Sequence, residues 1–169
     1  MWNELLALWP SYLAFGLSFF VILVSWISHH DLMQLIHTPS RGVLLANGCV
    51  LIYVTFIPFP TTVLAKNLGG PEVSTAVAFY CGTFVLGSSA FHLLLETIAR
   101  CELRDPERGG QAVERIRRGY HLALLTYAVS TALALVLPYV ALALAMAVRV
   151  HLVRLRTPHW TPESRHITR

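Results

Sequence analysis

Charged residues are scarce in this sequence. Only 13% of its 169 residues are Asp, Glu, Lys or Arg, and 55% are hydrophobic, whereas a soluble domain carries about 25% charged residues. There are two aspartates, Asp31 and Asp105, and one lysine, Lys66. The composition therefore excludes an ordinary soluble domain. The net charge of +4 comes from arginines in short segments between apolar runs, so we expect no nucleic-acid partner.

The sequence also lacks the patterns that carry covalent or redox chemistry. Its three cysteines, Cys49, Cys81 and Cys101, show no Cys-x-x-Cys spacing, which gives no support to a zinc or redox site. No Ser/His/Asp order, phosphate-binding glycine loop or pair of carboxylates occurs, so we expect neither an enzyme nor a cofactor. The alternating segments of about ten residues that are typical of a membrane β-barrel are absent too.

Long apolar runs instead predict an all-α, multi-pass helical membrane protein. Pro10 to Ser28 is a run of 19 residues without a charge, about the length that a helix needs to cross a hydrocarbon core. The 29 uncharged residues from Tyr120 to Val148 are too many for one crossing, and Pro138 predicts a tight turn between two short helices. We expect a single integral membrane domain over residues 1–169 with five helices, at about 10–28, 42–64, 73–97, 120–136 and 138–155.

Side-chain size divides the first predicted helix into two faces. The small residues Ser11, Ala14, Ser18 and Ser25 form one stripe, and such stripes let neighbouring helices approach closely in lipid. We expect this stripe to face a helix that the chain does not contain. The opposite stripe is bulky and consists of Phe15, Phe19, Ile22 and Trp26.

The distribution of basic residues predicts the orientation in the membrane. Two segments, 29–41 and 100–119, and the tail from Arg149 hold twelve of the thirteen Lys and Arg residues, and Lys66 is the other. The positive-inside rule therefore favours five crossings, with the link 100–119 and the tail 156–169 cytoplasmic and Met1 outside. We expect the link to be solvated or to be a short amphipathic connector, and Arg149, Arg154 and Arg156 to extend to the interface.

The sequence offers one candidate network of polar side chains at the cytoplasmic end of the first two helices. Trp26 precedes His29 and His30 by three and four residues, so a helix places it near both, and Asn47 lies one turn into the second helix. The histidines are interfacial and solvated, or they form a hydrogen-bond hub between helices. A metal or haem site is a third interpretation, with His37, His92 and His121 as further candidate ligands.

A second cluster is predicted near the end of the third helix. His92 and Glu96 are four residues apart and share a face, and Arg100 follows by another four. An interfacial ion-pair cluster of these three residues is favoured over a proton relay, because it lies close to the membrane boundary.

Two strings resemble a known family. Residues 8–32, LWPSYLAFGLSFFVILVSWISHHDL, resemble the second transmembrane helix of the transmembrane protein 175 family, which comprises K⁺-permeable channels of bacteria, archaea and animal endolysosomes. Residues 44–65, LLANGCVLIYVTFIPFPTTVLA, are similar to its third helix, with Asn47 and Pro58-Phe59-Pro60 at matching positions. The rest of the chain fits helices four to six by architecture.

The resemblance implies a bacterial six-helix subunit that assembles as a homotetramer around a pore for K⁺ in the cell membrane, in contact with lipid. In the family the first helix lines the pore and carries an Arg-x-x-x-Phe-Ser-Asp motif, which residues of helices two and three brace. By position these bracing residues are Trp26, His29 or His30, and Asn47.

No Phe-Ser-Asp occurs in the sequence. We therefore expect the five helices to correspond to helices two to six, and the pore-lining helix to be missing, as in a fragment or a truncated gene model. The leading hypothesis is an incomplete K⁺ channel subunit for passive transport. The alternatives are a non-conducting structural or regulatory membrane subunit, and a His-ligated haem or metal protein of the membrane.

Overall fold

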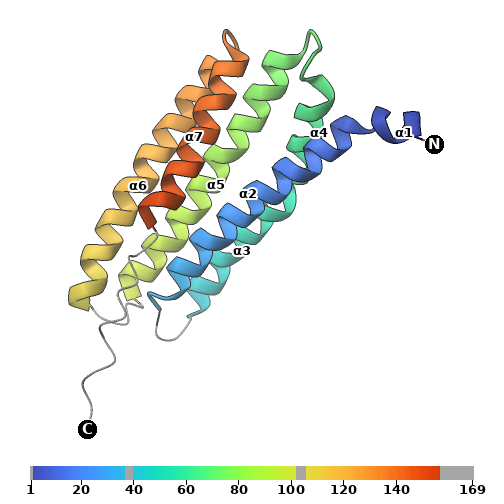
Figure 1. Cartoon of the computed structure of the whole chain (residues 1–169). Coiled ribbons are helices and arrows are strands. Elements are labelled where there is room, and N and C mark those ends of the chain that lie inside the picture. Colours follow the sequence, from blue (N-terminus) through green and yellow to red (C-terminus); the bar gives the residue numbers. More distant parts are fainter. Residues whose placement is uncertain (1, 37–39, 102–105, 157–169) are drawn as a thin grey trace.

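A computed structural model describes residues 2–36, 40–101 and 106–156 of the chain, and these form a bundle of long helices (Figure 1). The predicted tail from residue 157 onward and His37 lie outside the described residues. The helices, in chain order, are α1 (Trp2–Ala7), α2 (Trp9–Met33), α3 (Arg41–Phe56), α4 (Pro58–Asn67), α5 (Val73–Cys101), α6 (Pro106–Leu133) and α7 (Pro138–Arg156).

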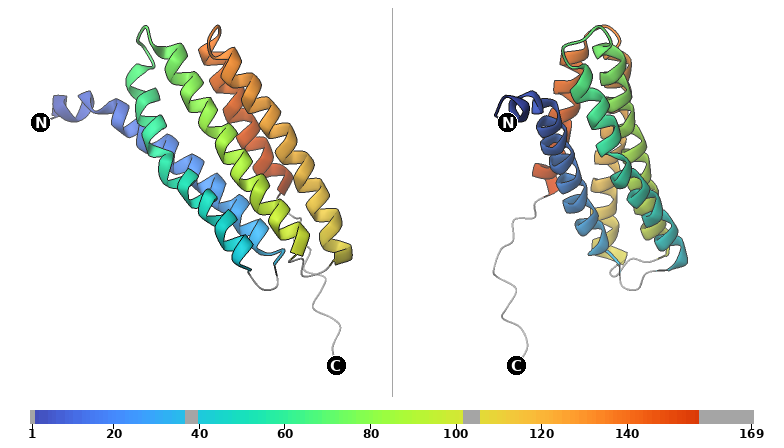
Figure 2. Two further views of the ribbon diagram at one scale, coloured as in Figure 1. Left: turned by 180° about the vertical axis from the view of Figure 1, so that it is seen from behind. Right: turned by 90° about the vertical axis from the view of Figure 1, so that its right-hand side faces the viewer.

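The long helices alternate in direction. Helix α2 descends from the end at which the chain begins, α3 and α4 rise together, α5 descends, α6 rises and α7 descends, while the short α1 projects sideways from the bundle (Figures 1 and 2). Helix α5 is central, because it packs against α3, α4, α6 and α7, and α2 packs against α4 and α7. The predicted helical class is confirmed for the described residues.

Among the described residues, three helical segments are long and apolar enough to cross a membrane: Trp9–Met33, Arg41–Asn67 and Val73–Arg100. The stretch Pro138–His151 is a shorter apolar helix. Helix α6 combines an arginine-rich first half with an apolar second half, so composition alone does not mark it as a span.

Prolines set the boundary between α3 and α4. Pro58 and Pro60 have no N–H, so the hydrogen bonds that they would donate to the preceding turn are missing. The break is small, because Ile57 keeps helical dihedrals (φ −48°, ψ −44°) and the amide of Thr61 still donates to the carbonyl of Ile57. At the other end, the Ser40 hydroxyl caps α3 by accepting from the amide of Val43 at 3.4 Å.

Two helices extend beyond the spans expected from hydropathy. Helix α2 continues past Ser28 to Met33, so both adjacent histidines are helical rather than part of a link. Helix α6 begins at Pro106, so most of the link 100–119 is helix, which agrees with an amphipathic connector rather than a solvated link. Within it Val113 is buried and Ile116 packs against the core, an apolar spacing that continues to the buried Tyr120 and was hidden among arginines.

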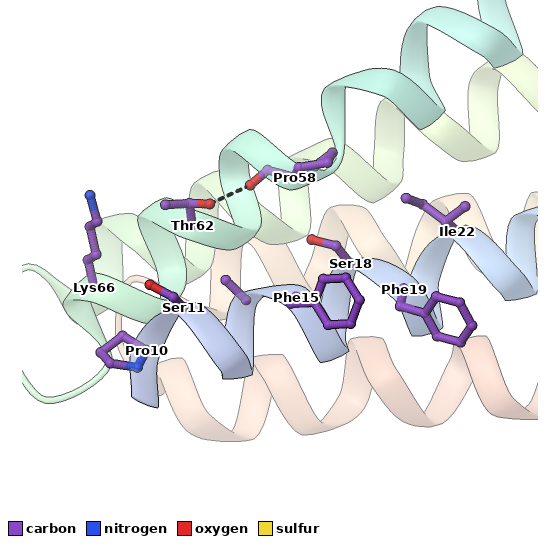
Figure 3. A pocket seen from close by; sticks show the side chains of 10 residues that line it. Pro10, Ser11, Phe15, Ser18, Phe19, Ile22, Pro58, Thr62 and Lys66 are labelled. Carbon is purple, nitrogen blue, oxygen red and sulfur yellow. Dashed lines mark hydrogen bonds between the residues drawn. The ribbon is translucent and has the colours of Figure 1, made fainter. Parts of the chain in front are cut away.

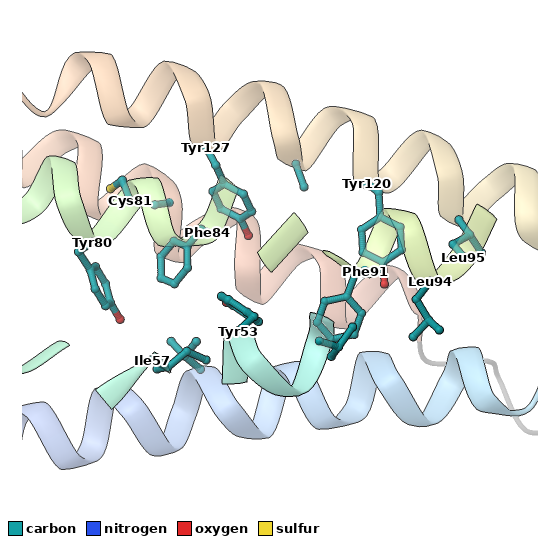
Figure 4. Packing of buried hydrophobic residues seen from close by; sticks show 14 of the residues in the cluster. Tyr53, Ile57, Tyr80, Cys81, Phe84, Phe91, Leu94, Leu95, Tyr120 and Tyr127 are labelled. Carbon is teal, nitrogen blue, oxygen red and sulfur yellow. The ribbon is translucent and has the colours of Figure 1, made fainter. Parts of the chain in front are cut away.

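The core is rich in aromatic side chains from α3, α5 and α6. Figure 4 shows the rings of Tyr53, Tyr80, Phe84 and Tyr127 packed around the middle of the bundle. Phe84 lies 4.8 Å from Tyr80 and 5.4 Å from Tyr127, measured between ring centroids. Such pairs stabilise a bundle by packing, which is the main attraction between helices in lipid.

Candidate functional site

A hydrogen bond joins His29 of α2 to Asn47 of α3. Helices α2 and α3 are antiparallel and connected by a short link, so the end of one lies beside the start of the other (Figure 1). His29 Nε2 lies 2.7 Å from Asn47 Oδ1, and the contact is partly buried. Because an amide oxygen only accepts, Nε2 of the imidazole donates the proton. The N–H of His29 and the amide oxygen of Asn47 thus satisfy each other at the end of the bundle.

The side chain of His30 points in a different direction from that of His29. Its ring stacks on Trp26 at a centroid distance of 5.5 Å and an interplanar angle of 16°. Its Nε2 accepts from the side-chain amide of Gln34 at 2.9 Å. Trp26 and His30 are exposed whereas His29 is half-buried, so the structure divides the predicted network into two parts. His29 and Asn47 lie together inside, and Trp26 and His30 lie on the outer surface.

The outer surface of α2 carries a row of exposed aromatic side chains. Phe15, Phe19 and Trp26 are 75%, 59% and 61% exposed, and the first two stack with centroids 6.4 Å apart. We call these three residues the aromatic ridge. A groove of about 350 Å³ runs beside it between α2 and α4. Figure 3 shows Phe15 and Phe19 along this groove, with Lys66 near one end.

The small residues of α2 do not await an absent neighbour. Ala14, Ser18 and Ser25 are buried within this chain, because α2 packs this face against α4 and α7. The expectation that the small stripe would be left unpaired is therefore wrong, and the bulky stripe is the exposed one. The size of the side chains alone does not predict which face of a helix packs against the rest of its own chain.

The predicted cluster around Glu96 includes a further arginine, Arg117. Glu96 of α5 is bound by Arg117 of α6, with Nε to Oε1 at 2.6 Å and Nη2 to Oε2 at 3.2 Å. Arg117 also donates to Glu114 at 2.7 Å, so one guanidinium holds two carboxylates. Arg100 is exposed. The structure therefore brings together His92 and Glu96 with Arg117, which the sequence did not single out.

Electrostatics favour the ionised forms at the start of α6, outside the apolar half of that helix. Hydrogen bonds from Arg118 and then Arg117 lower the pKa of the Glu114 carboxyl. Hydrogen bonds to Glu96 and then Glu114 raise the pKa of Arg117. The pair between α5 and α6 thus stays charged at neutral pH.

Two imidazoles lie next to this ion pair. His92 Nε2 of α5 is 3.4 Å from His121 Nε2 of α6, with ring centroids 4.7 Å apart. Among the described residues, no group of three or more His, Cys, Asp and Glu side chains is placed to hold a metal ion.

Arg149 of α7 is the polar residue that sequence reasoning misplaced. It was expected to extend to the membrane interface, but it is only 7% exposed. Its Nη1 donates to Ser25 Oγ at 3.1 Å and its Nη2 to the hydroxyl of Tyr53. One sequence signal exists in hindsight. Arg149 precedes Arg154 by five residues, which places it more than one helical turn deeper in the bundle.

Fold and site together define a multi-pass helical membrane protein in which polar side chains of the described residues pair between helices. The sequence model of the family described as "Endosomal/lysosomal potassium channel TMEM175" matches residues 1–58. A potassium channel of Streptomyces collinus is 33% identical over 138 residues, which cover 80% of this chain and 67% of the relative. The chain belongs to the TMEM175 family, and the family predicted from residues 8–65 is confirmed.

Two further comparisons support the same family. A potassium channel of Chamaesiphon minutus is 36% identical over 135 residues, covering 79% of this chain and 66% of the relative. The chain thus spans about two thirds of the length of these relatives. The crystal structure of a lysosomal potassium-selective channel TMEM175 homolog from Chamaesiphon minutus is similar with a TM-score of 0.78 and 31% identity, over 92% of this chain and 79% of the other.

Proposed function

We propose that the chain is a subunit of a potassium channel that passes K⁺ passively across the cell membrane. The observation that carries the proposal is the similarity to the potassium-selective homolog from Chamaesiphon minutus, which extends over 92% of this chain at 31% identity. Two relatives named potassium channels share 36% and 33% identity with it. No covalent chemistry is needed, since a narrow apolar constriction or a ring of oxygen ligands is enough for selective conduction.

The proposed topology has five crossings. The described helices supply three long spans, and α6 and α7 form a hairpin whose apolar parts add two. The end of the bundle that holds Arg41, Arg100 and the arginines of α6 is cytoplasmic by the positive-inside rule. The opposite end, with Lys66, is then outside, and the tail is cytoplasmic.

The outer face of α2 is proposed to bind a pore-lining helix in a homotetramer. The aromatic ridge is exposed, and His30, which stacks on Trp26, extends it toward the cytoplasmic end. His29 and Asn47 brace α2 against α3 directly behind this face. By position, the resemblance assigns Trp26, His29 or His30, and Asn47 to the support of the pore helix. The cluster of His92, Glu96 and Arg100, extended by Arg117, is proposed to fix α5 to α6 at the interface.

One observation favours a second candidate, a structural or regulatory subunit that does not conduct alone. The Phe-Ser-Asp sequence that the resemblance places in the pore does not occur in these 169 residues. A subunit without it supplies the surrounding helices of a channel and no residue of the constriction.

Reconstitution distinguishes the two candidates. We expect liposomes that contain the 169-residue chain alone to show the K⁺ flux of protein-free liposomes. Joined to the motif-bearing helix of the Chamaesiphon minutus relative, the chain should give K⁺ flux that exceeds this background. If the joined form assembles but conducts nothing, the channel proposal fails and the structural subunit is favoured. Flux from the chain alone would show that the pore lies among its own helices.

A further inference from the structure

Arg149 places a fixed positive charge inside the bundle. Its side chain comes from α7 and reaches toward α2 and α3, where Ser25 and Tyr53 accept its hydrogen bonds. With 7% of its surface exposed, it has little contact with water or with lipid headgroups. Arginines in membrane helices pair with acidic partners or reach water, because an isolated charge in this medium is costly.

The immediate partners of Arg149 are neutral. Both hydrogen-bond acceptors are hydroxyls, and the guanidinium lies over the rings of Phe84 and Tyr127 at 4.4 and 6.0 Å from their centroids. In the part of the chain that the structure describes, Arg149 forms no ion pair with a carboxylate. Aromatic faces attract a cation, yet they leave its full charge uncompensated.

One donor of this guanidinium has no partner. Arg149 Nε is buried and forms no hydrogen bond among the described residues. A buried donor without an acceptor costs about 1–3 kcal/mol, and more in a charged group. The structure therefore contains a buried, electron-poor N–H group for which the described side chains supply no acceptor.

A small cavity adjoins Arg149. It has a volume of about 30 Å³ and lies where α2, α5, α6 and α7 meet, with Ser25, Ser28, Ser88 and Tyr127 in its lining. This is room for one species the size of a water molecule. Phosphate, with four oxygens around phosphorus, is too large for it.

We propose that this cavity binds one small monovalent anion, of which chloride is the physiological example. The anion accepts from the unpaired N–H of Arg149 and from the hydroxyl of Ser28 on α2, since the hydroxyls of Ser25 and Ser88 donate to backbone carbonyls. Its charge compensates that of the guanidinium. A water molecule would satisfy the donor but not the charge. A cation is excluded by repulsion from Arg149, so the site is distinct from any path for K⁺.

Thermal unfolding of the purified full chain in uncharged detergent tests the proposal. Potassium concentration and ionic strength are held constant while gluconate is replaced by chloride or bromide. A ligand that binds only the folded state raises Tm with its concentration, so we expect a saturable rise in chloride and bromide and none in phosphate. Equal Tm values in chloride and gluconate would show a water-filled cavity and overturn the proposal.

Arginine variants locate the effect. Arg149→Gln should abolish the rise of Tm in chloride, whereas the matched Arg118→Gln, at a side chain that is 79% exposed, should keep it. A rise in Arg149→Gln as large as in the wild type would place the anion elsewhere and overturn the proposal.

A second measurement uses the wild-type chain alone, in case Arg149→Gln fails to fold. Crystals grown in bromide should give an anomalous peak within hydrogen-bonding distance of the Arg149 guanidinium. A map without a peak in this cavity would contradict the proposal. Neither readout depends on K⁺ conduction, so a failure here and a failure of the proposed channel function are distinguishable.

Discussion

His29 and His30 are neighbours in the chain, yet they have different partners. Consecutive residues of a helix point about 100° apart, so His29 reaches Asn47 between α2 and α3 while His30 stacks on Trp26 at the outer surface. Hypotheses about the roles of His29 and His30 must therefore treat the two imidazoles separately. His29 joins two helices of the chain by a hydrogen bond, and His30 lies on the outer surface.

A double-mutant cycle tests the inner pair. We expect His29→Ala and Asn47→Ala each to lower the free energy of unfolding in mixed micelles, with a coupling of about 0.5–1.5 kcal/mol, the usual net value of such hydrogen bonds. His30→Ala is the matched control and should lower it less, because its partner Gln34 is in the same exposed turn. Additive effects of the first two changes would contradict the hydrogen bond.

Gly87 allows Tyr53 to reach Arg149. A Cβ atom at Gly87 would overlap the Tyr53 ring, so only glycine lets the ring cross α5 at this point. We expect Gly87→Ala to displace Tyr53 and to destabilise the chain by about 1–3 kcal/mol, as other overpacked cores do. Urea or SDS titration of purified protein measures this. Gly48→Ala on α3, where a Cβ would meet nothing within 4 Å, is the control and should not destabilise the protein.

At the scale of helices, α5 and α6 are joined by a charged pair at one end and by aromatic packing in the middle. The ends of Glu96 and Arg117 form two parallel hydrogen bonds, the geometry that makes arginine–carboxylate pairs strong. The side chains are 25% and 31% exposed, so this pair is less screened than a surface salt bridge. Further along, Phe91 stacks on Tyr120 with centroids 6.1 Å apart.

Replacing Glu96 and Glu114 by glutamine, one at a time, should separate their contributions to stability. We expect Glu96→Gln to lower the free energy of unfolding by about 1–3 kcal/mol, because a half-buried guanidinium loses its charged partner. Glu114→Gln, at the exposed end of the same network, should lower it much less, because a solvent-exposed ion pair contributes little to stability. Chemical denaturation at low and high salt measures both, and the Glu114 effect should shrink in high salt. Equal losses for the two variants would show that Glu96 holds no special position.

In the whole molecule, the aromatic ridge and the Arg149 site lie on different faces of α2. The ridge faces outward and is proposed to meet a pore helix, while Ser25 of the same helix accepts from Arg149 inside the bundle. Helix α2 thus lies between the proposed assembly surface and the buried guanidinium of Arg149. In this arrangement the fixed positive charge is kept away from the proposed pore side.

Cysteine labelling tests the proposed orientation. In a chain whose three cysteines are replaced by alanine, Gly69→Cys in the α4–α5 link should react with a membrane-impermeant maleimide on intact spheroplasts. Arg115→Cys on α6 should react only after permeabilisation, because the positive-inside rule places that end in the cytoplasm. The reverse pattern would invert the topology, and labelling of both sites on intact spheroplasts would contradict the five crossings.

Hydropathy, proline and motif spacing were enough to predict the helical membrane class, the break at Pro58, the turn before Pro138 and the family, because each of them acts within one segment. The start of α6 at Pro106, the binding of Glu96 by Arg117 and the burial of the small stripe of α2 depend instead on tertiary packing. The same packing places Arg149 inside the bundle. Each of these features depends on which helices are in contact. A helix with two faces that could pack buries the face that fits its neighbours.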